Sequence, residues 1–228
     1  MIKFSNVCLE YTDTISALNN VSLNIDQGEF VFMIGKSGAG KTSLIKLLSR
    51  ELKPTTGRIW FAGRDISRIR KYNLARYRRN FGIIFQDYKL LKNKTAYENI
   101  AYALEVTGAK GSDIREKTAA ALQLVSLEDR KNSYPSELSG GEQQRIAIAR
   151  AFINFPSVII ADEPTGNLDK ENAQVVMNVL EKINKRGITV IVSTHDRGLV
   201  NSMKKRVIAL KNGSIIYDEN PGEYIDDI

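Results

Sequence analysis

The chain has 228 residues, 43% of them hydrophobic and 26% charged, with a net charge of +7. This balance is typical of a globular protein with one α/β domain, and a membrane-spanning helix is excluded because no apolar run approaches roughly 18–20 residues. The single cysteine, Cys8, excludes an internal disulfide and is interpreted as a strand residue. The chain starts without a signal-peptide pattern, so we expect it in the cytoplasm, and its charge favours an acidic partner: nucleic acid, anionic lipid or nucleotide.

Apolar and polar residues alternate at 2–5 and again at 21–25, which is typical of strands in a half-exposed sheet. The run from Phe30 to Ile34 is apolar throughout and is followed by a glycine, which predicts a strand buried on both faces. Short strands are expected at 58–63 and 81–85. A helix is expected from about Lys41, and its core face comprises Leu44, Ile45, Leu47 and Leu48.

The pattern is almost wholly helical from residue 95 to residue 155, with Ser112 as the predicted N-cap of a helix at 113–124. After this block, strand–helix–strand alternation returns and predicts an α/β fold with a parallel sheet, which binds ligands at the carboxyl ends of its strands. The helical block is interpreted as an insertion into that core. The later elements are buried strands at 158–161 and 188–193, a helix at about 171–185, and a hairpin at 207–211 and 214–217 joined by Asn212 and Gly213.

A glycine-rich loop follows the buried strand at 30–34. Its residues, in the pattern G-x-x-x-x-G-K-[ST], are Gly35, Lys36, Ser37, Gly38, Ala39, Gly40, Lys41 and Thr42. Glycines let backbone amides approach a polyphosphate, and the next helix points its positive end at the same phosphates. Lys41 is expected to reach the β- and γ-phosphates, and Thr42 to place its hydroxyl on Mg²⁺. The loop therefore predicts a Mg–ATP site.

Two acidic residues, Asp162 and Glu163, end the apolar strand at 158–161. Adjacent carboxylates are costly there unless a cation or a role in proton transfer balances them. Asp162 suits the Mg²⁺ sphere, and Glu163 suits polarising the attacking water. His195, the only histidine, follows the strand at 188–193; a lone histidine is usually structural, but this place makes a γ-phosphate contact plausible.

A second anion-binding helix start is predicted at residues 138–143, where Ser139 is an N-cap followed by Gly140 and Gly141. The alternative is an ordinary capped helix. Physical reasoning from the residues does not say why one chain needs two such sites.

These segments together resemble the ABC ATPases over nearly the whole chain. Residues 35–42 resemble the Walker A loop, 158–163 Walker B, and 138–143, from Leu138 to Gln143, the signature motif peculiar to the family. Gln86 resembles the Q-loop glutamine, 167–169 the D-loop, and His195 the switch histidine. The resemblance implies a P-loop NTPase fold of the RecA-like kind, with an antiparallel N-terminal β part and a helical signature part.

The resemblance also implies the roles of single residues. It assigns catalysis to Glu163, His195 and Lys41, and metal binding to Thr42, Gln86 and Asp162. One ATP would be bound by Tyr11, which would stack on adenine, and by Gly35, Ser37, Gly38, Ala39, Gly40, Lys41, Thr42, Ser43 and Gln86. Two cassettes pair head to tail in this family, so the partner's ATP would be bound by Ser139, Gly140, Gly141, Gln143 and Asp169. This implies a homodimer on ATP binding and a single domain of residues 1–228, with a core at 1–86 and 157–228 and a helical part at 87–156.

Within the family, the chain resembles the bacterial cell-division branch at 57–63, 83–87 and 161–169, the last of which that branch shares with the lipoprotein-release and macrolide-export groups. The shortness of the chain after the hairpin and the basic stretch at 64–79 favour the cell-division branch. There the ATPase drives a mechanical change in a membrane protein that controls peptidoglycan hydrolases. The segment from Asp87 to Thr95 would contact that partner at the cytoplasmic face of the plasma membrane. The lipoprotein-release and macrolide-export groups remain alternatives. A nucleic-acid-associated cassette is not expected, since neither a coiled-coil insertion nor a second cassette is present, and a P-loop kinase leaves 138–143 unexplained.

A basic stretch at 64–79 is not assigned by these motifs. Either it is a solvated face, or it lies near anionic lipid headgroups. Its cations are Arg64, Arg68, Arg70, Lys71, Arg76, Arg78 and Arg79, against Asp65 alone.

Overall fold

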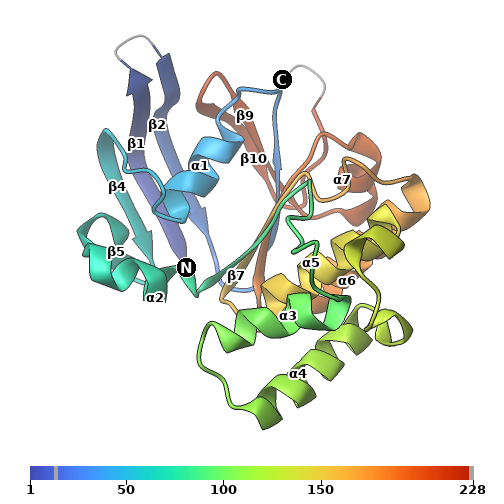
Figure 1. The fold of residues 1–228 in the computed structure, drawn as a ribbon. Coiled ribbons are helices and arrows are strands. Elements are labelled where there is room, and N and C mark those ends of the chain that lie inside the picture. Colours follow the sequence, from blue (N-terminus) through green and yellow to red (C-terminus); the bar gives the residue numbers. More distant parts are fainter. Residues whose placement is uncertain (13–14, 226–228) are drawn as a thin grey trace. The chain divides into compact units, whose positions relative to one another are not determined.

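The structure, a computed structural model, describes residues 1–12 and 15–225, and the chain forms two compact units (Figure 1). The first unit joins Met1–Arg78 to Thr189–Ile228, and the second comprises Arg79–Ile188. The division of the chain into a core at 1–86 and 157–228 and a helical part at 87–156 stays a prediction.

An antiparallel sheet forms the N-terminal part of the first unit, with its strands in the order β2-β1-β4-β5. Its strands are β1 (Ile2–Thr12), β2 (Ile15–Ile25), β4 (Thr56–Phe61) and β5 (Arg64–Asp65). In β1, Ile2 and Phe4 are buried while Lys3 between them is exposed, because successive side chains of a strand point to opposite faces. The predicted half-exposed strands are thereby confirmed.

A mostly parallel sheet forms the rest of the first unit, in the order β10-β9-β3-β8, with β10 antiparallel to β9. They are β3 (Phe30–Ile34), β8 (Thr189–Ser193), β9 (Arg206–Lys211) and β10 (Ser214–Glu219), with helices α1 (Lys41–Leu48) and α7 (Arg197–Met203). Strand β3 is buried along its whole length and pairs in parallel with both β8 and β9, as its unbroken apolar sequence predicts. Strands β9 and β10 form the expected hairpin, and Asn212 and Gly213 at its turn both have positive φ, 49° and 77°.

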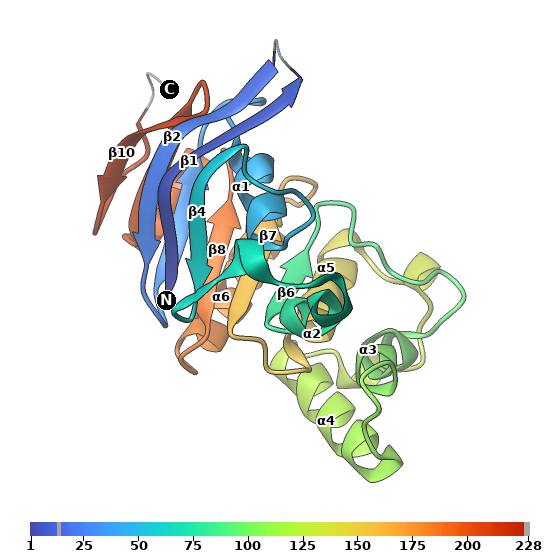
Figure 2. The same ribbon diagram turned by 90° about the vertical axis from the view of Figure 1, so that its left-hand side faces the viewer.

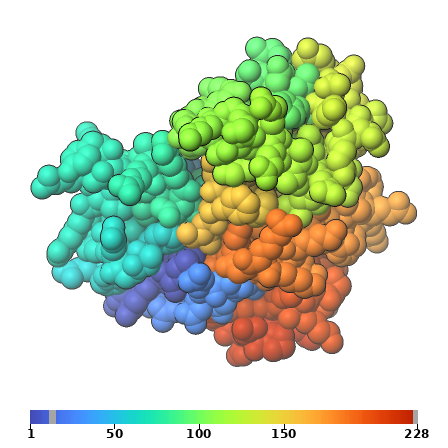
Figure 3. All heavy atoms as spheres, turned by 90° about the horizontal axis from the view of Figure 1, so that it is seen from below, coloured from blue at the N-terminus to red at the C-terminus, as the bar shows by residue number. Residues whose placement is uncertain are grey.

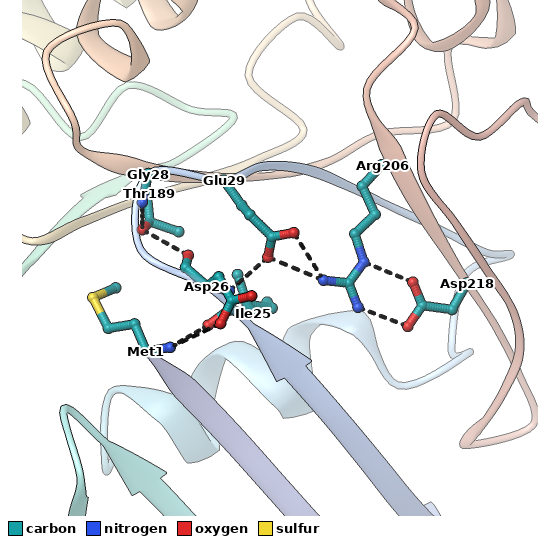
Figure 4. A network of polar contacts seen from close by, with 8 residues as sticks. All are labelled: Met1, Ile25, Asp26, Gly28, Glu29, Thr189, Arg206 and Asp218. Carbon is teal, nitrogen blue, oxygen red and sulfur yellow. Dashed lines mark hydrogen bonds and ion pairs between the residues drawn. The ribbon is translucent and has the colours of Figure 1, made fainter.

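An arginine holds this hairpin beside the start of β3 (Figure 4). The guanidinium of Arg206 in β9 donates to both carboxylate oxygens of Asp218 in β10, at 2.7 and 2.8 Å. It also donates to Glu29, which precedes β3, at 3.0 and 3.2 Å. Such bidentate pairs add geometric specificity to the charge attraction. Arg206 therefore fixes the strands that flank the glycine-rich loop.

The second unit packs helices around a parallel strand pair (Figure 2). Its elements are β6 (Phe81–Ile84), α3 (Ala96–Glu105), α4 (Gly111–Leu124), η3 (Glu128–Arg130), η4 (Pro135–Glu137), α5 (Gly140–Phe152), β7 (Val158–Asp162) and α6 (Lys170–Asn184). Strand β6 passes so close to α5 that a Cβ atom on Gly82 would overlap the carbonyl oxygen of Ala151. No helix in residues 1–12 and 15–225 has the length and apolarity needed to cross a membrane.

One expectation about local structure was wrong, and one helical segment was not predicted. Helix α4 begins at Gly111 with Lys110 as its N-cap, not at residue 113 with Ser112 as the cap. The hydroxyl of Ser112 donates to Asp113 at 3.3 Å and caps no backbone amide. For the segment after β5 no helix or strand was predicted, and it forms η1 (Ile66–Arg68), η2 (Lys71–Asn73) and α2 (Leu74–Arg78).

Candidate active site

The glycine-rich loop joins β3 to α1 in the first unit, and two of its glycines are required by sterics. Gly35 has φ of +150°, and a Cβ atom there would lie 2.5 Å from the carbonyl oxygen of Leu210. Gly40 has φ of +111°, and a Cβ atom there would lie 2.8 Å from the carbonyl oxygen of Ala17. Any side chain would have to displace backbone. The loop can therefore take this form only with glycine at both positions.

Lys41, the first residue of α1, folds back over this loop. Its Nζ atom donates to the carbonyl oxygen of Gly35 and, at 3.2 Å, to that of Lys36. The amide of Gly213, in the hairpin turn, donates to Ala39 at 3.1 Å and braces the loop from the other side. Lys36, Ser37, Gly38 and Thr42 are exposed. The loop thus presents exposed backbone amides, a helix N-terminus and an ammonium group, which together form a phosphate cradle.

Tyr11 reaches the same helix from the N-terminal sheet. It lies near the end of β1, is 48% exposed, and its hydroxyl oxygen lies 3.2 Å from Oγ of Ser43 in α1. The structure therefore brings Tyr11 and Ser43 together, and a planar exposed ring lies beside the start of α1. Stacking of this ring on adenine stays a prediction.

His195 leaves the same sheet edge as Gly35. Strands β3 and β8 run parallel, with Met33 opposite Ser193. The amide of Thr194 then donates to Met33 at 3.2 Å, so the two chains are still paired one residue beyond β8. His195, the next residue, is exposed. Its place at the carboxyl edge of the sheet agrees with the general position of ligand sites in parallel sheets.

In the second unit, the predicted acidic pair and the predicted glutamine lie at one edge. Strands β6 and β7 run parallel with Ile84 opposite Ala161, so Gln86 and the residues after Ala161 leave the sheet together. The side chain of Gln86 donates to Asn167 at 3.3 Å, and Asn167 donates back to the carbonyl oxygen of Gln86 at 3.3 Å. Asp162 and Glu163 are half-buried.

The helix predicted to bind a second anion begins as expected. Ser139 caps α5: its hydroxyl accepts from the amide of Glu142 at 3.3 Å, and the Glu142 carboxylate accepts from the amide of Ser139 at 2.8 Å. These bonds with Ser139 hold the pKa of Glu142 below its usual value. Gln143 donates to the carbonyl oxygen of Leu138 at 3.0 Å. The helix start is therefore rigid and exposed at Ser139.

Asn172, which the sequence did not single out, joins this helix start to Asp169. Its amide and its side chain donate to the Asp169 carboxylate at 2.9 and 2.7 Å. The backbone bond from Asn172 is the largest cause that lowers the pKa of Asp169. A Cβ atom on Gly141 would overlap the Asn172 side chain, so α5 and α6 meet where only glycine fits. Gly141 and Asp169 are thus brought together through one asparagine.

Arg150 on α5 was also missed, although it fixes the loop that follows Gln86. Its guanidinium donates to the carbonyl oxygens of Tyr88 and Lys89, at 2.9 and 2.7 Å. Both loop residues have positive φ, 58° and 49°, a backbone form that needs support. Burial lowers the pKa of Arg150. The one sequence signal was an arginine among apolar neighbours in the helix.

The hydroxyl group of Tyr88 lies beside Gly140, the first residue of α5. A Cβ atom on Gly140 would be 2.9 Å from that oxygen. Further along the same loop, the side chain of Asn99 in α3 is fully buried and bonds the backbone of Leu91 in both directions, at 2.8 and 3.1 Å. The segment from Asp87 to Thr95 is therefore anchored at both ends, by Arg150 and by Asn99.

The described residues contain no group of three or more His, Cys, Asp or Glu side chains that could hold a metal ion. The predicted Mg²⁺ ligands are instead a hydroxyl, an amide oxygen and one carboxylate: Thr42, Gln86 and Asp162. Oxygen donors of this kind fit Mg²⁺, which keeps several waters and binds substrate phosphates rather than a complete protein cage. The donor set therefore suits the ion.

Known proteins resemble the chain over most of its length. A sequence profile of the family described as "ABC transporter" matches residues 18–166. The "Cell division ATP-binding protein FtsE" of Bacillus subtilis (strain 168) is 48% identical over 224 residues, which cover 98% of this chain and 98% of that protein. The protein of the same name from Escherichia coli (strain K12) is 43% identical over 215 residues, which cover 94% and 97%.

Solved structures agree with the fold. The dimeric, post-hydrolysis ATP-binding cassette MJ0796 bound to ADP and Pi has a TM-score of 0.85 and 35% identity, and the match covers 98% of this chain and 100% of that one. The protein cbiO1 from Clostridium perfringens, part of the ABC transporter complex cbiONQ, has a TM-score of 0.90 and 31% identity, over 96% and 88%. The expected fold class, with an antiparallel N-terminal sheet and a mostly parallel core, is confirmed.

Proposed function

Because the chain belongs to the ABC transporter family of ATPases, we propose that it supplies ATP-driven work to a bacterial cell-division complex, as the name of its FtsE relatives implies. The observation that carries this proposal is 48% identity to an FtsE protein across almost the full length of both chains. That the chain is an ATPase follows from its family and from the post-hydrolysis state of a solved relative. The glycine-rich loop, with Gly35 and Gly40 fixed by sterics, is the part of the chain that suits a triphosphate.

In this proposal, the loop binds the phosphates of ATP. Backbone amides at residues 36–42 donate to phosphate oxygens, and the N-terminus of α1 favours their negative charge. Lys41 exchanges the neutral carbonyl oxygens of Gly35 and Lys36 for phosphate oxygens, whose negative charge attracts the ammonium group more strongly. Tyr11 holds the base. Thr42, Gln86 and Asp162 would hold Mg²⁺, which would neutralise charge on the phosphates.

Glu163 acts as the base that polarises the attacking water. Its place directly after the buried strand β7, at the carboxyl edge of a parallel strand pair, supports this role. Gln86, bonded to Asn167, would help to hold the metal, and His195 would donate to the γ-phosphate.

A second copy of the chain completes each site. Ser139, Gly140, Gly141 and Gln143 would donate to the neighbour's ATP, and Asp169 would contact it from the D-loop. The exposed, capped start of α5 supports this, as does the dimeric state of the MJ0796 structures. ATP binding would close the homodimer, and hydrolysis would open it.

The work is passed to an integral membrane partner at the cytoplasmic face of the inner membrane, where the chain is peripheral. We expect that partner to resemble FtsX and to control peptidoglycan hydrolases outside the cell. The segment from Asp87 to Thr95 is the expected contact. Its anchoring by Arg150 and Asn99 supports a role in passing the conformational change to the partner.

Capture from membranes tests this function. A tagged chain with Glu163→Gln, which holds ATP, should co-purify with a membrane protein of four spans and one large external loop. Lys92→Glu, an exposed change inside the contact segment, should weaken capture, while Lys117→Glu, an equally exposed change on α4, should not. Capture of a lipoprotein-release or macrolide-export permease instead would contradict the cell-division role and leave the ATPase activity intact.

A further inference from the structure

A basic surface lies on the first unit, and the ATPase machinery does not use it. It begins at β5 and continues over η1, η2 and α2, whose atoms are teal in Figure 3. All of its cations are exposed, and they are Arg64, Arg68, Arg70, Lys71 and Arg76. We call these residues the basic face.

The segment that carries the basic face is fixed to the end of α1. The buried side chain of Arg50 donates to the carbonyl oxygen of Ile66 at 2.7 Å. Arg78 donates to Ser49 at 3.0 Å, and the hydroxyl of Tyr77 donates to Leu48 at 2.6 Å. The anchoring therefore uses backbone carbonyl oxygens, which accept hydrogen bonds and neutralise no charge. The positive charge of the segment remains available at its surface.

Carboxylates do little to balance this charge. Within residues 1–12 and 15–225, one member of the basic face has an ion pair, Arg68 with Asp65 at 3.5 Å. The Asp65 side chain is only 14% exposed and also accepts from the amide and the hydroxyl of Ser67, so it serves the local turn. Like charges held together on a rigid surface repel one another. The arrangement is favourable when an anionic surface lies against it.

An aromatic ring stands among the cations. Tyr72 is 73% exposed, and its hydroxyl accepts from Arg70 at 3.3 Å. Tyrosine is enriched where a protein meets the headgroup region of a membrane, since its ring is apolar and its hydroxyl is polar. A nucleic-acid surface would be expected to offer several rings for stacking bases, and Tyr72 is the one exposed ring between Arg64 and Arg78 in the described chain.

We propose that the basic face docks on anionic lipid headgroups of the membrane in which the partner protein lies. The inference rests on the proposed function only for the nearness of that membrane. Each lysine or arginine near an anionic bilayer strengthens binding by roughly fivefold, so a few together give a weak and salt-sensitive attachment. Such docking would orient the chain before and between encounters with its protein partner.

Sedimentation with vesicles tests the proposal on the full chain without its partner. The vesicles are phosphatidylcholine alone or with phosphatidylglycerol, at low salt. The test variant carries Arg70→Gln, Lys71→Gln and Arg76→Gln. The control variant removes the same charge from α4 and the residue before it: Lys110→Gln, Arg115→Gln and Lys117→Gln, all exposed.

We expect wild-type chain and control to bind the anionic vesicles, and not the neutral ones, with salt weakening the binding. The test variant should bind on the order of a hundredfold more weakly. Tyr72→Ala, which keeps every charge, should bind less strongly than wild type. ATP hydrolysis should be equal in all of them, and a chain that binds vesicles without hydrolysing ATP would contradict the proposed function and not this inference.

Three results would overturn the inference. One is equal binding to neutral vesicles, and another is an equal loss in the control variant, which would reduce the effect to net charge. The third is displacement of the chain from vesicles by duplex DNA, with DNA binding the wild type more tightly than lipid does and this preference absent in the test variant. The basic face would then be a nucleic-acid surface.

Discussion

Glu163 has a backbone conformation that glutamate seldom adopts. Its φ is +49°, and the amide of Gly166 donates to its carbonyl oxygen at 3.2 Å, which closes a tight turn after β7. A residue held in this region costs of order 1–3 kcal/mol, and such residues cluster at functional sites. The strained backbone at this position supports the role of Glu163 as the base.

Glu163→Gln keeps the size of the side chain and removes its basicity. We expect hydrolysis to fall by about 10²- to 10⁴-fold, the usual contribution of a general base, while ATP affinity is unchanged. Phosphate release and calorimetric titration measure the two quantities. Glu171→Gln, an exposed acid in the first turn of α6, is the control. Turnover at the wild-type rate in the Glu163 variant would remove this residue from catalysis.

Sequence reasoning found the residues whose role depends on local pattern. Gly35 and Gly40 were predicted because a cradle for phosphate needs them at fixed spacing, and the structure shows what a side chain would strike at each. Arg150 and Asn172 were missed because their partners, Tyr88 and Asp169, are brought to them by tertiary packing. The spacing of motifs along the sequence does not predict such tertiary contacts.

At the scale of elements, the start of α5 depends on an ionised carboxylate. The pKa of Glu142 is lowered from its usual 4.5, mainly by the hydrogen bond from the Ser139 amide. Because the folded-state pKa is the lower one, the resulting stability is fully present above pH 4.5 and is lost as the pH falls through the folded value. Acid should therefore weaken this helix start.

Glu142→Gln removes that dependence. We expect wild type to be more stable than the variant at pH 7 and the difference to shrink as the pH is lowered from 4.5 toward 3. Urea midpoints across this range measure it. A difference that stays constant down to pH 3 would show that the carboxylate's charge has no part in the cap.

Arg150 joins one helix to the loop that is expected to contact the membrane partner. Arg150→Ala should destabilise the chain by about 2 kcal/mol, because two charge-assisted bonds to carbonyl oxygens are lost. Hydrogen exchange should become more than tenfold faster at residues 87–91 and change less in β7. Arg115→Ala, exposed on α4, is the control. Unaltered exchange at 87–91 would contradict the anchoring role.

The elements with a strong local signal in the sequence, such as a period, an unbroken apolar run or a turn pair, were predicted well, and those without one were not. Strand β3, helix α1 and the hairpin of β9 and β10 have the expected places. The turns and the short helix at 66–78 were not predicted, because their sequence has no clear period. They are stabilised by hydrogen bonds of Arg50 and Tyr77 with backbone that is distant in the sequence. The cap at Ser112 was wrong because Gly111 is already helical.

At the scale of the whole molecule, the chain is expected to work as a pair. Ser139→Arg places a long cation at the exposed cap of α5. ATP binding to one chain should be unaffected, while the ATP-driven dimer of the Glu163→Gln chain should be lost on a sizing column. Arg115→Ser is a control with the opposite change in charge and no place in the expected interface. A normal dimer in the Ser139 variant would reject the shared site.

The central claim is that a triphosphate is bound by the amides of residues 36–42 together with Lys41. Hydrogen exchange of these amides, with and without Mg–ATP, tests it most directly. We predict strong protection across the loop in wild type, and little in Lys41→Ala at the same nucleotide concentration, while Lys46→Ala in the same helix behaves as wild type. Mg–ATP that binds tightly yet leaves the exchange of this loop unchanged would contradict the account.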